Sequence, residues 1–61
     1  MLWVMETAPI LIRRYARSRL YDPENRRYVT IGELRQWRRD KIPFVVIDSE
    51  TGADITLVLL A

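Results

Sequence analysis

Between Ile10 and Tyr21 the side chains alternate in character with a period of two. The even positions are mostly small or apolar, whereas the odd positions are Leu11, Arg13, Tyr15, Arg17, Arg19 and Tyr21. Successive side chains of a strand point to opposite faces of a sheet. The pattern therefore predicts one strand over residues 10–21 that gathers three arginines and two tyrosines on one surface. A helix over the same residues would spread the arginines around its axis, so this surface depends on the strand.

A turn and a second strand follow this segment. Asp22-Pro23-Glu24-Asn25 suits a type I turn, because proline presets φ at the second position and Asp and Asn favour the ends. Arg26 and Arg27 then lead into the strand residues Tyr28-Val29-Thr30. We expect the two strands to form an antiparallel hairpin whose tip carries further cations.

A helix is predicted to begin at Thr30. Thr30-Ile31-Gly32-Glu33 fits a capping box, with Val29 and Leu34 at the staple positions. Pro43 should end the helix by about Lys41. Its apolar stripe is Ile31, Leu34 and Trp37, and its cations are Arg35, Arg38 and Arg39. Cations near the last turn complement the helix dipole, so a structural role for Arg38 and Arg39 is at least as well supported as DNA contact.

The second half of the chain predicts a second hairpin. The β-branched run Phe44–Asp48 is typical of a strand buried on both faces, and Gly52 in the following turn can adopt positive φ. Residues 54–60 would return as a fourth strand, or turn into a short helix after Thr56. We therefore expect an α+β domain of ββαββ architecture over residues 10–61, with two antiparallel hairpins around one helix. Residues 1–9 form an N-terminal extension whose Leu2–Met5 segment has no assigned role.

The charges are distributed unevenly along the chain. Nine of the ten cations are arginine; six of these lie in residues 13–27 beside two acids, whereas residues 42–61 hold three acids and no cation. Such asymmetry indicates an anionic partner for the first half. The planar guanidinium pairs well with phosphates and guanine edges. The alternative is that these charges only solvate the surface of a small domain.

Composition excludes several classes of protein. The chain has no histidine, no cysteine and only two glycines, so we expect no enzyme, no metal site and no cofactor. Sixty-one residues make one domain, and a chain of this length buries only about 60% of its unfolded surface. Without a disulfide, we expect a homodimer or higher oligomer. Apolar runs of at most five residues predict neither a membrane span nor a signal peptide, which favours a cytoplasmic location.

Three linked motifs resemble the N-terminal DNA-binding domain of the polyhydroxyalkanoate synthesis regulator family. Residues 12–22 are similar to its opening of a basic pair, Tyr, a small residue, Asn-Arg-Arg and Leu-Tyr-Asp. Residues 27–34 resemble its Tyr-Val-Thr-Leu segment and following helix, and residues 51–56 its Thr-Gly-Glu-Asp-Ile-Thr element. Arg17-Ser18 replaces Asn-Arg, which removes an amide suited to reading a base, and Ala53 replaces Glu.

The resemblance implies a transcriptional regulator, usually a repressor, that is released from promoters when polyhydroxyalkanoate polymer binds. Longer members of the family continue into a polymer-associated region, so this chain is expected to be a stand-alone version or the DNA-binding module alone. We expect a dimer that presents basic hairpins to double-stranded DNA. The predicted contact residues are Arg13, Arg14, Tyr15, Arg17, Arg19, Tyr21, Arg26 and Arg27.

Other functions are compatible with the same residues. The basic surface could dock an acidic protein or another copy of the chain, and the tyrosines could bind RNA. Tyr15 and Tyr21 could equally pack across a hairpin without touching a ligand.

Overall fold

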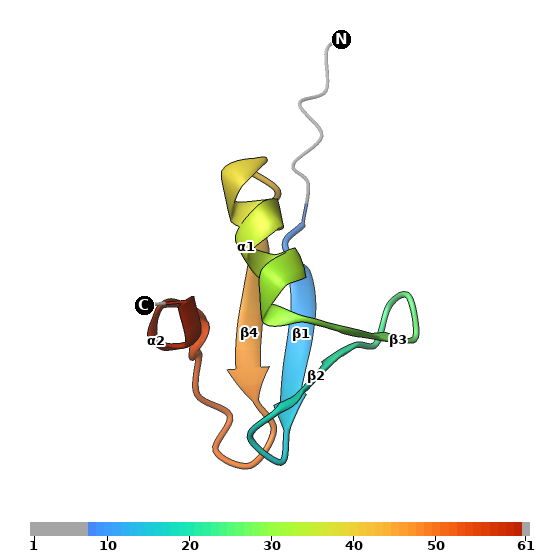
Figure 1. The fold of residues 1–61 in the computed structure, drawn as a ribbon. Helices are drawn as coiled ribbons and strands as arrows, with labels where there is room; N and C mark the ends of the chain where they lie inside the picture. Colours follow the sequence, from blue (N-terminus) through green and yellow to red (C-terminus); the bar gives the residue numbers. More distant parts are fainter. Residues whose placement is uncertain (1–7, 61) are drawn as a thin grey trace, which may run out of the picture.

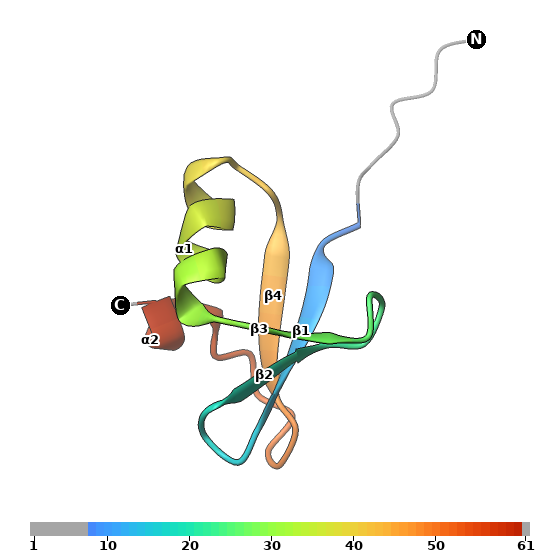
Figure 2. The ribbon, with the colours of Figure 1, turned by 45° about the vertical axis from the view of Figure 1, so that its right-hand side comes forward.

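The computed structural model describes residues 8–60, which form one mixed four-stranded sheet and two helices (Figure 1). The elements are β1 (Ile10–Tyr15), β2 (Arg19–Asp22), β3 (Arg27–Val29), α1 (Ile31–Arg39), β4 (Phe44–Asp48) and α2 (Thr56–Leu60). The strand order is β3-β2-β1-β4, with β1 antiparallel to β2 and parallel to β4. Both helices lie on the same side of β1 and β4 (Figure 2). No helix in the described range is long and apolar enough to cross a bilayer.

The prediction of one strand over residues 10–21 is wrong, because the chain reverses direction at residues 16–18. Ala16 and Arg17 adopt φ values of +47° and +66°, and β1 returns as β2 with Arg13 opposite Tyr21 and Tyr15 opposite Arg19. Positive φ in a hairpin turn is usually supplied by Gly, Asn or Asp, and none stands here. The turn therefore leaves no local sequence signal. Opposite residues of paired strands share a face, so the predicted surface persists across two strands.

The prediction of an α+β domain is confirmed, but the ββαββ arrangement with two antiparallel hairpins is wrong. β4 pairs in parallel with β1, from Ile10 opposite Phe44 to Arg14 opposite Asp48. Parallel neighbours need a long crossover connection, which β2, β3 and α1 together supply. Which strand β4 pairs with depends on contacts across the whole chain, and residue patterning does not specify it.

The last segment of the chain forms the short helix α2, which was one of its two predicted alternatives. Gly52 adopts the expected positive φ of +75°, and one bridge joins Ile47 to Asp54 before α2 begins. The Asp54 carboxylate accepts hydrogen bonds from the amide and hydroxyl of Thr56, at 2.9 and 2.6 Å. The Thr56 hydroxyl in turn accepts from the Val46 amide at 2.8 Å. Together with backbone hydrogen bonds from Asp48 to Ala53 and from Ile55 to Val46, the bond from Val46 to Thr56 satisfies the edge of β4 where a fourth antiparallel strand was expected.

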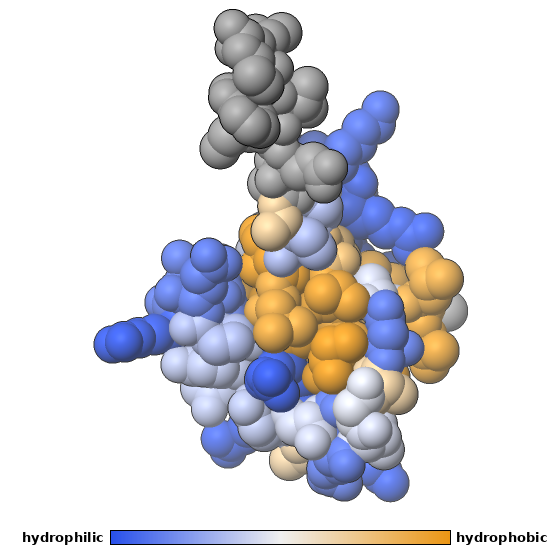
Figure 3. Space-filling view, turned by 180° about the vertical axis from the view of Figure 1, so that it is seen from behind, coloured by the Kyte–Doolittle hydropathy of each residue, from blue (hydrophilic) through white to orange (hydrophobic). Residues whose placement is uncertain are grey.

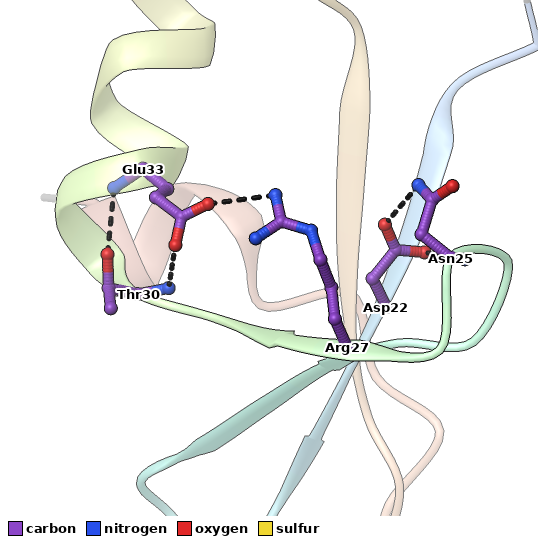
Figure 4. A network of polar contacts seen from close by, with 5 residues as sticks. All are labelled: Asp22, Asn25, Arg27, Thr30 and Glu33. Atoms are coloured by element: carbon purple, nitrogen blue, oxygen red, sulfur yellow. Dashed lines mark hydrogen bonds and ion pairs between the residues drawn. The ribbon is translucent and has the colours of Figure 1, made fainter.

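The hairpin predicted across Asp22-Pro23-Glu24-Asn25 is confirmed, although its strands are β2 and β3 and not the first two strands of the chain, and Asp22 organises its turn. This fully buried carboxylate accepts hydrogen bonds from the amides of Glu24 and Asn25, at 3.0 and 3.2 Å, and from the Asn25 side chain at 2.8 Å (Figure 4). Burial raises the pKa of Asp22, but these hydrogen bonds and the charge of Arg27 outweigh it and hold the pKa below the ordinary 3.8. The turn is therefore held by an ionised carboxylate.

The capping box at the start of α1 is confirmed. The Thr30 hydroxyl accepts from the Glu33 amide at 3.1 Å, and the Glu33 carboxylate accepts from the Thr30 amide at 3.4 Å (Figure 4). The staple residues Val29 and Leu34 are both buried. The helix ends at Arg39, two residues before the predicted limit at Lys41, which has a φ of +59°.

The hydrophobic core lies between the helices and one face of the sheet. Its buried side chains are Ile12, Leu20, Val29, Leu34, Val46 and Leu60. Trp37 packs edge-on against Phe44 with ring centroids 5.8 Å apart, whereas Ile31 is 40% exposed and contributes less than its place in the predicted stripe implied. β4 is not buried on both faces as expected, since Val45 and Ile47 are only half-buried. One face of the sheet thus remains open.

Replacing Thr30 with Ala should lower the free energy of unfolding by about 1 kcal/mol, because the amide of Glu33 loses its acceptor. Urea denaturation monitored by circular dichroism measures this change. Glu33→Gln is the matched control, since Gln also completes a capping box and sacrifices only an exposed ion pair. A Thr30→Ala protein as stable as the wild type would show that the cap contributes nothing.

The free energy of unfolding should fall as the pH drops below about 3.8. Because the folded pKa of Asp22 is lowered, its carboxylate stabilises the fold above the ordinary value, and this stabilisation is lost as the pH falls through the folded pKa. Asp22→Asn should be less stable than the wild type at pH 7, with the difference narrowing towards pH 2. Urea titrations at several pH values measure this, and Glu24→Gln on the same exposed turn is the control. If the free energies of unfolding of the wild type and Asp22→Asn differed by the same amount at every pH, the prediction would be wrong.

Candidate nucleic-acid interface

The sheet face opposite the helices, here termed the open face, carries most of the predicted site. Strand register places on it Leu11, Arg13, Tyr15, Arg19, Tyr21, Tyr28, Val45 and Ile47. Figure 3 shows an apolar patch at the centre of this side of the molecule, with hydrophilic side chains around it. The open face therefore has an apolar part over β1 and β4 and a basic, aromatic part over β1, β2 and β3.

Three tyrosines line a shallow groove of about 280 Å³ in the aromatic part. Tyr21 and Tyr28 stand opposite each other in register, with ring centroids 5.1 Å apart and ring planes at 64°. Tyr15 is 42% exposed and Tyr28 is 58% exposed, whereas Tyr21 is half-buried. Tyr21 thus packs across the hairpin, as one alternative proposed, while the other two rings remain accessible.

Two arginines lie beside the tyrosines of this groove on the strands, and two more occupy the turns next to β2. Arg13 lies opposite Tyr21, and Arg19 lies opposite Tyr15. Arg17 and Arg26 occupy the turns at the two ends of β2, where both residues have positive φ and are exposed. Figure 2 shows these turns projecting from opposite ends of β2. Within residues 8–60, none of the four guanidinium groups pairs with a carboxylate.

Arg14, another predicted contact residue, points away from the open face. It pairs with Asp48 at 3.2 Å, its side chain is 26% exposed, and its buried Nε has no hydrogen-bond partner among the described residues. The pKa of Asp48 is lowered mainly by the hydrogen bond from the Glu50 amide and further by Arg14, and these effects outweigh burial, which raises it. Arg14 occupies an even position of β1, so strand alternation directs it to the helix side.

Arg27 also faces the helices. Its guanidinium pairs with the Glu33 carboxylate at 2.9 Å, which links β3 to the capping box of α1 (Figure 4). Tyr28, which was not among the predicted contacts, takes the place on the open face that lies next to Tyr21. Alternation along β3 could have found it, since neighbouring residues of a strand face opposite sides.

The chain matches the family model described as the PHB/PHA accumulation regulator DNA-binding domain over residues 11–61. It is 40% identical over 50 residues to an uncharacterized protein of Allochromatium vinosum, covering 82% of this chain and 33% of that protein. It is 38% identical over 50 residues to an uncharacterized protein in the phbA 5′ region of Thiocystis violacea, covering 82% of this chain and 36% of that protein. The chain thus spans about a third of the length of these relatives.

No solved structure matches the chain. The family model nevertheless covers nearly all of it, including every described helix and strand except the first residue of β1, and it agrees with the resemblance found in the three sequence motifs. This chain therefore belongs to the family of PHB/PHA accumulation regulator DNA-binding domains.

Proposed function

We propose that this domain binds double-stranded DNA through the basic, aromatic part of its open face and serves in a transcriptional repressor of polyhydroxyalkanoate accumulation. Membership of a DNA-binding domain family is the observation that carries the proposal. The name of the Thiocystis violacea relative, which refers to the phbA 5′ region, supports a target near polymer-synthesis genes. The function is one of binding, with no catalytic step.

The charge arrangement supports contact with phosphates. Arg14 and Arg27 are paired with carboxylates, which leaves Arg13, Arg17, Arg19 and Arg26 as the cations of the open face and its turns. Only the tip of the β1–β2 hairpin, residues 15–19, extends beyond β3 and β4 as a two-stranded ribbon, and a ribbon of this kind fits the major groove of B-DNA. Arginines on such a ribbon can reach both phosphates and guanine edges.

Release by polymer is part of the same proposal. The regulator would leave its promoter when polyhydroxyalkanoate binds, as the family resemblance implies. The relatives are about three times as long as the matched segment. We therefore assign polymer sensing to regions of the longer proteins that lie outside the matched segment.

Replacing Arg17 and Arg19 with Ala should weaken binding to duplex DNA from the region upstream of the gene. Fluorescence anisotropy over a range of salt concentrations should give the wild type a steep negative log–log slope, and loss of two phosphate contacts should make that slope less negative by about 2. Arg35→Ala with Arg39→Ala is the matched control, because both residues are exposed on α1, on the other side of the sheet. A flat wild-type slope, or equal losses in both double variants, would refute the proposed interface.

The α2 surface supports a second element of the proposal, a homodimer. Leu57 and Val58 are 74% and 77% exposed, which is unusual for neighbouring apolar side chains. Beside them, a groove between the end of α1 and α2 is lined by Arg38, Lys41, Ile42, Pro43, Phe44, Thr56, Leu57 and Leu60. Its cations complement the segment over residues 42–60, which contains acids but no cation. A second copy therefore offers both the apolar side chains and the charge that this groove fits.

Replacing Leu57 and Val58 with Glu should dissociate the dimer without unfolding the domain, because both side chains are exposed in the single chain. Sedimentation equilibrium gives the mass of the wild type and the variant. Ala53→Glu adds an acid on the preceding exposed loop and should leave the mass unchanged. A monomeric wild type, or a variant that stays dimeric, would show that α2 is not the dimer contact.

A further inference from the structure

The tyrosine groove exposes ring faces, which contacts to the backbone of duplex DNA do not use. Tyr15 and Tyr28 keep 42% and 58% of their surface exposed, although folding could have buried both rings against the apolar part of the same face. Contacts to a DNA backbone are made by cations and hydrogen-bond donors, so a tyrosine takes part in them through its hydroxyl and not through the face of its ring. In an intact duplex, moreover, the flat faces of the bases are stacked on one another. The exposed ring faces are therefore suited to a ligand that presents unstacked planar groups.

Cations and rings alternate along β1 and β2 on the open face, and they lie beside one another across these strands. One row across the sheet runs Tyr28, Tyr21, Arg13, and the next row runs Arg19, Tyr15. Along β1 an arginine precedes a tyrosine on this face, and along β2 the same is true. A single nucleic-acid strand presents the same alternation, with a charged phosphate and a planar base at every nucleotide.

The groove is also shaped by rings on its walls. Tyr21 contacts Tyr28 edge-on, which fixes the orientation of Tyr28 and leaves it exposed. Tyr15 lies on β1, across β2 from Tyr28, and completes the lining. Stacking on aromatic side chains tolerates every base, because each base has a π-face, and basic side chains beside the rings hold the backbone.

We propose that the tyrosine groove stacks an unpaired base of a single-stranded nucleic acid, with Arg13 and Arg19 holding the adjoining phosphates. This inference deepens the proposed function, on which it rests, because it assigns a second form of ligand to the same face. Single-stranded DNA, as in a locally opened promoter, and single-stranded RNA share this chemistry. The ligand is recognised by its exposed bases and not by its sequence.

The test compares single-stranded and duplex ligands on tyrosine variants. Fluorescence anisotropy is measured with labelled oligo-dT, oligo-U and duplex DNA from the upstream region, for the wild type and for Tyr15→Leu with Tyr28→Leu. Leucine keeps apolar bulk on the sheet but has no ring, and thermal unfolding checks that the variant is folded. Loss of stacking should lower the affinity for single strands by about tenfold or more, whereas the affinity for duplex, to which these residues offer only their hydroxyls, should fall by clearly less.

The conservative variants separate stacking from hydrogen bonding. Tyr15→Phe with Tyr28→Phe keeps both rings and should bind single strands within about twofold of the wild type. If the leucine variant does not fold, this comparison is made with Tyr28→Leu alone, since Tyr28 is the more exposed ring. The inference is supported if oligo-dT or oligo-U loses affinity for the leucine variant and keeps it for the phenylalanine variant. The relative affinities of the two oligonucleotides then show whether the strand is DNA or RNA.

The outcomes distinguish this inference from the proposed function. Duplex binding by the wild type without measurable single-strand binding overturns the inference and leaves the proposed function intact. Equal losses for single strands and duplex in the leucine variants, or losses in the phenylalanine variants as large as in the leucine variants, also overturn it. A wild type that binds none of the three ligands refutes both proposals together.

Discussion

The alternation of side chains along β1 is the constraint on which the rest of the structure depends. β1 is flanked by β2 and β4, so its two faces continue onto both neighbours. Ile12 lies fully buried under the helices, whereas Arg13 on the next position is exposed on the open face. A shift of one residue in register would bury the guanidinium and expose the isoleucine, at a large cost in desolvation. One face of β1 therefore contributes to the core, and its other face contributes to the candidate interface.

Short-range polar contacts determine how the tyrosines of the aromatic groove are placed beside one another. The Asp22 carboxylate holds the turn that brings β3 beside β2, and that pairing sets Tyr28 against Tyr21. One residue beyond β3, the capping box starts α1, so the helix leaves the sheet at a defined point. Arg27 connects the two features through Glu33. Each of these bonds contributes only about 1 kcal/mol, but together they connect the hairpin to the start of α1.

Charge pairing on the helix side determines which arginines can reach a ligand. Asp48 and Glu33 hold Arg14 and Arg27, so these two of the six arginines in residues 13–27 support the fold. The other four lie on the open face or its turns, away from those carboxylates. Their potential adds up over one surface, which favours the approach of an anionic strand.

The sequence by itself determined the features that arise within a few residues: the turn at Asp22, the capping box at Thr30, the strand at Phe44 and the alternation that defines the open face. Its three linked motifs also indicated the family. Only the tertiary structure decided the chain reversal at Ala16, the parallel pairing of β1 with β4, the helical end of the chain and the neutralisation of Arg14. That last ion pair joins residues 34 positions apart, and the partners in the β1–β4 pairing are equally remote in sequence. Local hydrogen bonds depend on neighbouring residue types, whereas these remote pairings depend on the packing of the whole chain, which no short stretch of sequence contains.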